Sequence, residues 1–231
     1  MNSTDMCLLR FDGVSKKYPY EKTFLLEDVS FKVEEGENVG IACDVQCGKT
    51  TIVKMLAGLT KPTGGEIIFR GSGLKETPTK DMGLGVVFDD CALMPGKTAL
   101  KNIEFPMKVR KLPDYREKAL EAAKKFGLET VLYTKAKKLS AEDRLSVALA
   151  RLSVRKLSLL ALDGVSVGAE RLALLDFSAS LRLSSDIASL DGCDRVYVIA
   201  RGKTVFEGGF ASAKEYIEQT RCFDKFETAD E

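Results

Sequence analysis

Residues 40–51 read Gly-Ile-Ala-Cys-Asp-Val-Gln-Cys-Gly-Lys-Thr-Thr, and this stretch constrains the fold more than any other part of the chain. A phosphate-binding loop has the pattern Gly, four residues, then Gly-Lys-Ser/Thr, with a strand before it and a helix after it. Gly48, Lys49 and Thr50 complete that pattern, whereas Cys43 stands where its first Gly belongs. The stretch therefore indicates a nucleotide-binding ancestry together with a damaged loop.

The sequence on both sides of the loop has the pattern that this chemistry needs. We expect a strand over residues 37–42 and a helix over residues 51–59. The apolar positions of that helix are Ile52, Val53, Leu56 and Leu59. The N–H groups of such a loop and of the helix start bind phosphate, the Lys supplies a positive charge, and the Thr hydroxyl reaches a magnesium ion. A chance Gly-Lys-Thr in an ordinary strand-to-helix turn is the alternative.

Composition narrows the class of protein. The chain has 231 residues, which suits one large domain or two small ones. Its 35 basic and 34 acidic residues nearly cancel and are interspersed, so the charge does not predict a nucleic-acid partner. The absence of His excludes His-based triads, His metal sites and His acid–base chemistry. No apolar run approaches the roughly 18 residues of a membrane span, and residues 1–5 lack the pattern of a secretory signal.

The cysteines are scattered and form no Cys-x-x-Cys motif, which favours reduced thiols in a cytosol. They are Cys7, Cys43, Cys47, Cys91, Cys193 and Cys222. Cys43 and Cys47 are close in sequence. Two interpretations of them stay open, a redox-sensitive pair or small residues that fill former glycine positions.

Strand and helix patterns alternate after an antiparallel start. The predicted strands cover residues 7–17, 23–33, 66–70, 82–88, 157–162, 179–183 and 195–200. The predicted helical segments cover residues 100–109, 115–128 and, after the capping residue Ser140, a stretch that ends near residue 156. This order favours an α/β fold with a mainly parallel sheet flanked by helices.

The order of the motifs resembles the nucleotide-binding subunit of an ATP-binding cassette (ABC) transporter over roughly residues 8–218. Leu139-Ser140-Ala141-Glu142-Asp143-Arg144 lies where that family has its signature, Leu-Ser-Gly-Gly-Gln-Arg, and residues 147–151 continue the match without a gap. Residues 159–163 fall on the Walker B strand, and residues 195–208 resemble the closing strands. The resemblance implies a P-loop ABC-type ATPase fold, with a mainly parallel core sheet, an antiparallel N-terminal β subdomain and an α-helical subdomain.

The resemblance also implies a single nucleotide-binding domain over residues 1–231. Within it, the antiparallel strands and the P-loop core cover about residues 1–90, and the helical subdomain covers about residues 91–156. The rest of the core covers about residues 157–218, and residues 219–231 form a polar tail that is expected to fray.

Individual residues receive roles by the same resemblance. Tyr18 matches the aromatic residue that stacks on adenine. The nucleotide contacts in the loop fall on Cys43, Gln46, Gly48, Lys49, Thr50 and Thr51. The implied magnesium contacts are Thr50, Asp89 and Asp163. The signature-like residues, which would face the γ-phosphate held by a partner cassette, are Ser140, Ala141, Glu142 and Asp143. ATP and Mg²⁺ are the implied ligands, with binding in doubt because of the damaged loop.

The catalytic positions depart from the family's pattern. Gly164 stands where the family has the Glu that polarises the attacking water, and Ser185 replaces its switch His. Asp89 replaces the Gln that touches magnesium and couples to the membrane subunit. No catalytic position is therefore intact.

The signature and the segment after Walker B depart as well. The signature glycines and Gln have become Ala141, Glu142 and Asp143, two of which are acidic. The segment between Asp163 and Asp194, which in the family holds the loop that aligns the two halves of the dimer, is shorter than usual. Both halves of a shared ATP site thus look damaged.

These departures predict a degenerate cassette, a pseudo-ATPase with a structural or regulatory role on a membrane transporter complex. We expect weak or absent ATP binding and hydrolysis that is lost or very weak. The implied partners are membrane-spanning permease subunits, which residues 93–106 would face, and a second cassette in a homodimer or heterodimer, with no nucleic acid. The implied location is cytoplasmic, peripheral on the inner face of the cell membrane.

Two alternatives stay open. One is an active ABC transporter ATPase with compensated motifs, in which Asp89 or Asp90 positions the water. The other is a soluble interaction module derived from a cassette.

Overall fold

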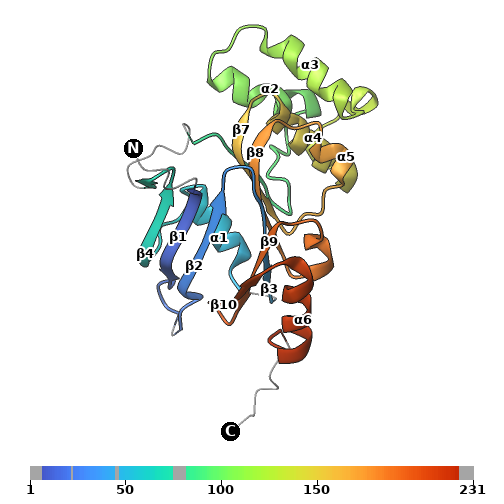
Figure 1. Cartoon of the computed structure of the whole chain (residues 1–231). Coiled ribbons are helices and arrows are strands. Elements are labelled where there is room, and N and C mark those ends of the chain that lie inside the picture. Colours follow the sequence, from blue (N-terminus) through green and yellow to red (C-terminus); the bar gives the residue numbers. More distant parts are fainter. Residues whose placement is uncertain (1–6, 22, 45–46, 75–81, 224–231) are drawn as a thin grey trace, which may run out of the picture.

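Two sheets form the centre of the fold in the computed structural model, which describes residues 7–21, 23–44, 47–74 and 82–223. The first sheet is antiparallel, with strand order β2-β1-β4-β5. Its strands are β1 (Cys7–Lys16), β2 (Leu26–Glu34), β4 (Gly64–Phe69) and β5 (Ser72–Gly73). Figure 1 shows this sheet on one side of the molecule, with the second sheet packed beside it.

The second sheet has strand order β10-β9-β3-β8-β7-β6 and is parallel except for β10. Its strands are β3 (Asn38–Cys43), β6 (Leu84–Val87), β7 (Leu157–Asp163), β8 (Phe177–Ser184), β9 (Arg195–Ala200) and β10 (Lys203–Gly208). The predicted α/β class, with a mainly parallel core sheet and antiparallel N-terminal strands, is confirmed.

Some helices pack on the sheets, whereas three others form a separate group. They are α1 (Lys49–Leu56), α2 (Ala99–Val109), α3 (Tyr115–Lys125), α4 (Ala141–Ser153), α5 (Ala169–Leu172) and α6 (Phe210–Thr220). Short 3₁₀ turns occupy residues 129–131, 136–138 and 187–190. Helices α2, α3 and α4 share their own apolar core, and Figure 1 shows them together at one end of the molecule. Among the described residues, no helix combines the length and the apolar character that a membrane span requires.

Helix α1 links the two sheets through a common core. Its buried side chains, such as Ile52 and Leu56, join apolar residues from β1, β2 and β4 on one side and from β3, β7, β8 and β9 on the other. Burying a side chain of this kind stabilises a fold by roughly 1.5–3 kcal/mol. The apolar face of α1 therefore fixes the start of this helix against both sheets.

The sequence misplaced the end of one helix and did not predict two others, α5 and α6. Helix α1 ends at Leu56 rather than Leu59, because Gly58 adopts a left-handed φ of +72° that stops the helix, and Leu59 is left 68% exposed. Helix α6 was not predicted. It packs on β9 and β10 through the buried Ala213 and a partly buried stacked pair, Phe206 and Tyr216.

The predicted cap of α4 is confirmed. Ser140 is the N-cap, and its Oγ accepts a hydrogen bond of 3.0 Å from the backbone N of Asp143. Glu142 and Asp143 lie in the first turn, where their negative charge is favourable next to the helix N-terminus. The start of α4 is thus well determined by local sequence.

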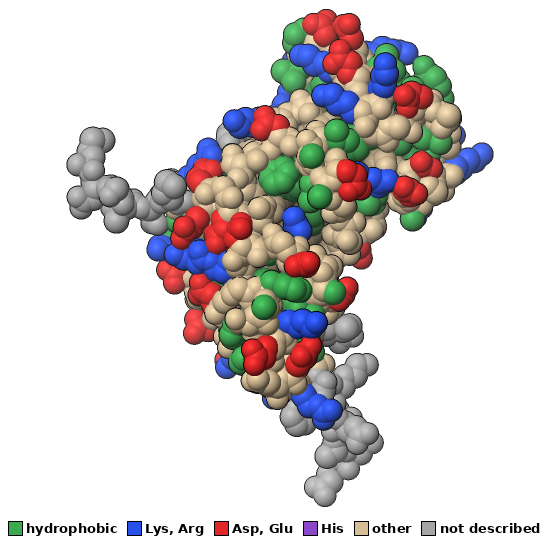
Figure 2. All heavy atoms as spheres, turned by 45° about the vertical axis from the view of Figure 1, so that its right-hand side comes forward, with side chains coloured by type: hydrophobic (Ala, Val, Ile, Leu, Met, Phe, Trp, Pro, Cys, Tyr) green, Lys and Arg blue, Asp and Glu red, His purple; other side chains and the backbone are tan. Residues whose placement is uncertain are grey.

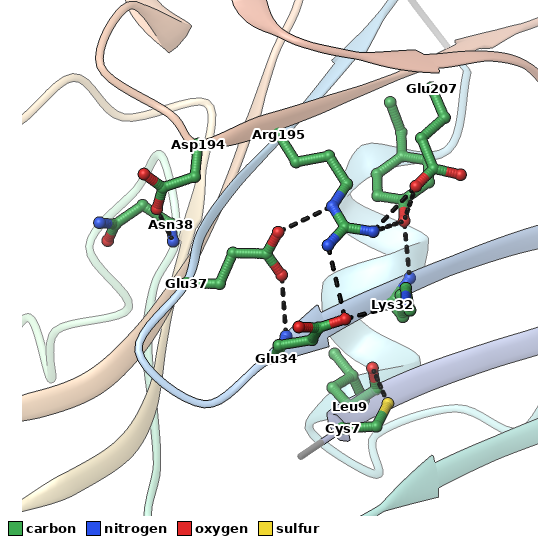
Figure 3. A network of polar contacts seen from close by, with 10 residues as sticks. Cys7, Leu9, Lys32, Glu34, Glu37, Asn38, Asp194, Arg195 and Glu207 are labelled. Carbon is green, nitrogen blue, oxygen red and sulfur yellow. Dashed lines mark hydrogen bonds and ion pairs between the residues drawn. The ribbon is translucent and has the colours of Figure 1, made fainter. Parts of the chain in front are cut away.

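Arg195 on β9 ties the two sheets together on the surface (Figure 3). Its guanidinium forms ion pairs with Glu37 at 2.7 Å, Glu207 at 2.9 Å and Glu34 at 3.6 Å. Glu34 belongs to the antiparallel sheet, whereas Glu207 belongs to β10 of the parallel one. The hydrogen bonds to Glu207 and Glu37 outweigh the effect of partial burial and raise the pKa of Arg195 above its usual range. One guanidinium therefore bridges three carboxylates at this junction.

We predict that Arg195→Met destabilises the fold by about 2 kcal/mol, because Glu37, only 12% exposed, loses its ionic partner. Urea unfolding measures the change. The control is Lys203→Met, whose pair with Glu27 is more than half exposed on both sides, at 56% and 52%. It should cost below about 0.5 kcal/mol. Equal losses in the two variants would refute the role of Arg195.

Candidate functional site

The candidate site lies at the edge of the parallel sheet where the carboxyl ends of four strands meet. Ala42 of β3 pairs with Ser184 of β8, and Leu162 of β7 pairs with Val87 of β6, so these strands end at nearly the same level. The residues that follow them are the phosphate loop, Ser185, Gly164 and Asp89. Ligands of open α/β sheets bind outside such strand ends. The fold thus gathers residues that are far apart in the sequence.

Lys49 spans the gap between two of these strands. Its Nζ donates a hydrogen bond of 2.7 Å to the Ser185 Oγ beyond β8, and another of 3.4 Å to the backbone O of Asp44. The structure therefore brings together the loop Lys and the residue at the predicted switch position. In this arrangement the ammonium group is directed at a neutral hydroxyl and a carbonyl.

Asp163 lies beside the loop at the end of β7 and is 2% exposed. Burial raises the pKa of its carboxyl, the nearby Asp89 adds to this rise, and a hydrogen bond from Thr50 and the charge of Lys49 oppose it. In the part of the chain that the structure describes, its Oδ2 has no hydrogen-bond partner. A buried carboxylate oxygen without a partner is costly unless a ligand satisfies it.

The residues around Asp163 fit a magnesium ion. The Thr50 hydroxyl bonds the same carboxyl, and Asp89 is close enough to alter its pKa. Hydroxyl and carboxylate oxygens are the ligands that Mg²⁺ prefers. The unsatisfied Oδ2 supplies the remaining acceptor. The donor set predicted for the metal is thus brought together, and a bound Mg²⁺ would neutralise phosphate charge there.

Tyr18 lies over the start of α1. Its hydroxyl is 3.3 Å from the Oγ1 of Thr51, and the Nζ of Lys16 lies 4.9 Å from the centre of its ring. A hollow of about 220 Å³ opens beside it, lined by Leu25, Gly48, Lys49, Thr50 and Thr51. The structure therefore places Tyr18 next to the loop, as the assignment to adenine requires, while stacking itself stays a prediction.

The phosphate loop differs from the expectation in one respect. Cys43 and Cys47 are joined by a disulfide, so the expectation of reduced thiols fails for this pair, whereas the other four cysteines are thiols. Gly48 keeps the left-handed φ of +92° that its place before the helix requires. Gln46, predicted as a nucleotide contact, lies outside the described residues. Sequence spacing alone did not show that the two cysteines meet.

Gly164, predicted to stand at the position of the water-polarising Glu, has φ +67°. This left-handed conformation is unfavourable for a residue with a β-carbon. Its N–H donates to the backbone O of Leu183 on β8, at 2.8 Å. The backbone after Asp163 therefore has a conformation that favours glycine.

The signature-like residues lie at the start of α4 and are bonded among themselves. The Ser140 Oγ donates to Asp143 Oδ2 at 2.6 Å, while Glu142 forms an ion pair of 2.6 Å with Arg171 of α5. No hydrogen bond or ion pair between described residues joins this group to Lys49 or Thr50. Within one chain, the signature residues and the loop are thus separate.

Two polar residues of this region were missed by sequence reasoning. Asp44 has a carboxyl whose pKa is raised, mainly by burial, and its Oδ1 is buried without a hydrogen-bond partner among the described residues. Arg171 pairs with Glu142 from a helix that was not predicted. Asp44 lay within the loop pattern itself, so its position could have indicated a carboxylate beside the phosphate site. Nothing in the sequence indicated the partner of Arg171.

Comparison with known proteins gives consistent matches. The family described as "ABC transporter" matches residues 26–166. The molybdate/tungstate import ATP-binding protein WtpC of Pyrococcus horikoshii is 33% identical over 158 residues, which are 68% of this chain and 45% of that protein. The oligosaccharides import ATP-binding protein MsmX of Bacillus subtilis is 32% identical over 187 residues, 80% of this chain and 49% of that protein. The chain spans about half the length of the curated relatives it matches.

Solved structures show the same fold. An ATP-binding cassette, solved as a dimer in a post-hydrolysis state with ADP and Pi, matches with a TM-score of 0.75 and 23% identity. The match covers 87% of this chain and 98% of that one. A bacterial Atm1-family ABC exporter with ATP bound matches with a TM-score of 0.76 and 20% identity, over 92% of this chain and 42% of that one.

We predict that Asp163→Asn makes the protein more stable than the wild type at pH 7. Because burial raises the folded-state pKa of Asp163, its ionised form costs stability, and this cost appears as the pH rises above the usual Asp pKa of about 3.9. The advantage of the variant should shrink as the pH falls toward 4. Thermal unfolding across this pH range measures it.

The matched control is Asp176→Asn at an exposed position, which should change the free energy of unfolding at pH 7 by less than about 0.5 kcal/mol. A variant at position 163 that is less stable than the wild type at pH 7 would contradict the argument, because it would mean that the carboxylate stabilises the fold.

Proposed function

Because the chain belongs to the ABC transporter family through its ATP-binding domain, we propose that it is a degenerate cassette subunit with a structural or regulatory role on a membrane transporter complex. In this proposal ATP binding is weak or absent and hydrolysis is lost or very weak. The single observation that carries this proposal is which residues lie where the γ-phosphate of a bound ATP would be. There Lys49 meets Ser185 instead of a switch His, and Gly164 offers no carboxylate.

The lost groups are those that act on water. Removing a positioned general base typically slows a reaction by about 10²- to 10⁴-fold. The family's Glu and His act as a unit, so the effects of losing both need not multiply. Asp89 remains near Asp163, yet its Oδ1 already accepts a hydrogen bond of 2.8 Å from the backbone N of Asp90. This supports the proposal that the chain keeps metal ligands but lacks a group that activates water.

The signature end supports the same proposal. Its hydroxyl donor, Ser140, is bonded to Asp143, and Glu142 and Asp143 carry negative charge where the family has glycine and Gln. A carboxylate about 5 Å from a phosphate charge opposes it by roughly 3 kcal/mol at an effective dielectric constant of about 20. Solvent and magnesium would reduce that figure, and so would the ion pair of Glu142 with Arg171. We therefore propose that this end does not bind the γ-phosphate of a partner cassette.

We propose permease subunits and a second cassette as partners, in a homodimer or heterodimer at the inner face of the cell membrane. The relatives that carry import in their names support a transporter of the import class. On the face that Figure 2 shows, Lys and Arg side chains are interspersed with Asp and Glu, so no extended field of one sign favours nucleic acid. In this proposal the membrane subunits select the cargo.

We further propose the domain division that the sequence predicts. It consists of a β core, a helical subdomain at about residues 91–156 and a polar tail.

One observation favours an active ATPase as the second candidate. Thr50 and Asp163 are bonded, and the buried Oδ2 of Asp163 is available to a ligand. In that case ADP and ATP would bind with Mg²⁺, and Asp89 or Asp90 would have to position the water. The two candidates differ in turnover, which an assay separates.

We predict that the purified chain releases no inorganic phosphate from Mg-ATP above the rate of its Lys49→Ala variant, because the water-activating groups are gone. A steady-state phosphate assay, with and without vanadate, measures this. Isothermal titration of both proteins with Mg-ATP should give dissociation constants weaker than micromolar. Vanadate-sensitive turnover that vanishes in Lys49→Ala would favour the active ATPase instead.

We predict that Gly164→Glu does not restore turnover and lowers the melting temperature. A β-carbon at φ +67° costs roughly 1–2 kcal/mol, which corresponds to about 2–8 °C for a chain of this size. Gly164→Asn is the control, since Asn tolerates the left-handed region better. Differential scanning calorimetry with the phosphate assay tests both. A rise in Mg-ATP hydrolysis in Gly164→Glu would contradict the expected misplacement of the carboxylate.

A further inference from the structure

The phosphate loop contains a pair of cysteines that the proposed function does not use. Cys43 is the last residue of β3, and Cys47 directly precedes Gly48, the N-cap of α1. The structure joins them by a disulfide, and their Cα atoms are 6.0 Å apart. That separation lies within the range of 4.4–6.8 Å that disulfides require. Backbone placement alone therefore allows the bond without movement of either segment.

Each cysteine is held differently by its surroundings. Cys43 is fully buried and held by the sheet, where it pairs with Ile199 of β9. Cys47 is 4% exposed and its backbone N makes one long hydrogen bond, 3.4 Å, to the O of Asp44. Both side chains belong to the core cluster beneath the loop. The S–S bond is thus a covalent tie between the rigid strand and the residue that leads into the helix.

Apolar packing holds α1 against both sheets, but the start of the helix lacks a side-chain cap. Gly48 has no side chain to cap the helix, and no side-chain cap bond is made there. Glycine is also the residue with the most conformational freedom. The disulfide therefore restrains the point at which the loop enters α1, which is the point that positions Lys49 and Thr50.

We propose that Cys43 and Cys47 form a thiol–disulfide site whose oxidation state sets the mobility of the N-terminal turn of α1. The oxidised form holds this turn against the sheet, and the reduced form lets it open. The class of oxidant is a peroxide and the class of reductant is a dithiol. The proposal does not depend on nucleotide binding, so it stands apart from the proposed function.

The chemistry balances with these two reagents. On oxidation the two S–H bonds break, the Sγ–Sγ bond forms, and hydrogen peroxide accepts two electrons and two protons to leave as two water molecules. On reduction a dithiol gives two electrons and two protons to the pair and becomes a disulfide itself. Cys47, the more exposed of the two, is the sulfur that a reagent reaches first.

The experiment uses the full chain without nucleotide, treated with hydrogen peroxide or with dithiothreitol. Thiols are blocked with iodoacetamide before digestion with trypsin. The tryptic peptide of residues 33–49 contains Cys43 and Cys47 and no other cysteine. After oxidation it should be unalkylated and lighter by two hydrogen atoms than the unmodified dithiol peptide. After reduction it should carry two alkyl groups.

Amide hydrogen exchange on the same two samples tests the mechanical effect. Peptides that cover residues 49–53 should exchange at least about tenfold more slowly in the oxidised chain, because the tie removes open states. Peptides from α6 should exchange equally in both samples. Cys193→Ala, a buried cysteine in a different apolar cluster, should leave the difference intact.

Cys47→Ala should abolish the difference between oxidised and reduced samples. If that variant does not fold, the two oxidation states of the wild type still decide the question. Alkylation of both cysteines after peroxide treatment would overturn the proposal. So would pairing of either one with a third cysteine, or equal exchange of residues 49–53 in the two states.

Discussion

The parallel register of β3, β8, β7 and β6 is the constraint on which the site depends. Hydrogen bonds between neighbouring strands fix the level at which each strand ends, and this places Lys49, Ser185, Asp163 and Asp89 at one edge. A shift of one residue in any strand would exchange the side chains that it presents to the two apolar cores. The apolar cores on both sides of the sheet therefore also determine the geometry of the polar groups at its edge.

Two kinds of residue lie at this edge of the sheet. Thr50 and Asp163 remain bonded, and the buried Oδ2 of Asp163 keeps the electrostatic cost that a cation would relieve. By contrast, Gly164 and Ser185, which we propose stand at the positions of the family's Glu and His, have no ionisable group. A cation site and a water-activating site need different chemistry, so one can persist while the other is lost. In the proposed function, the chain can therefore keep ligands for a cation while it hydrolyses no ATP or very little.

The sequence predicted those features that local pattern determines. The strand before the phosphate loop and the helix after it follow from apolar spacing, and the cap at Ser140 follows from capping chemistry. The structure confirms the strand, the presence of the helix and the cap. The contact of Lys49 with Ser185 joins residues 136 positions apart, so only the strand order brings them together. The role of Arg195 was missed for the same reason, and the end of α1 was misplaced because the left-handed Gly58 overrides the apolar pattern through Leu59.

Internal bonds at the two ends of the site bear on how nucleotide would bind. Lys49 donates to Ser185 at 2.7 Å, and Ser140 donates to Asp143 at 2.6 Å. An incoming phosphate must displace such bonds, and a hydrogen bond to a charged group is worth about 1.5–3 kcal/mol. Since 1.4 kcal/mol is about a tenfold change in affinity, each displaced bond offsets roughly a tenfold part of the affinity that the new contact with phosphate contributes. In such a cassette the phosphate-facing groups already have hydrogen-bond partners within the chain, so they need no nucleotide. This property is compatible with the proposed subunit that other proteins of a complex hold in place.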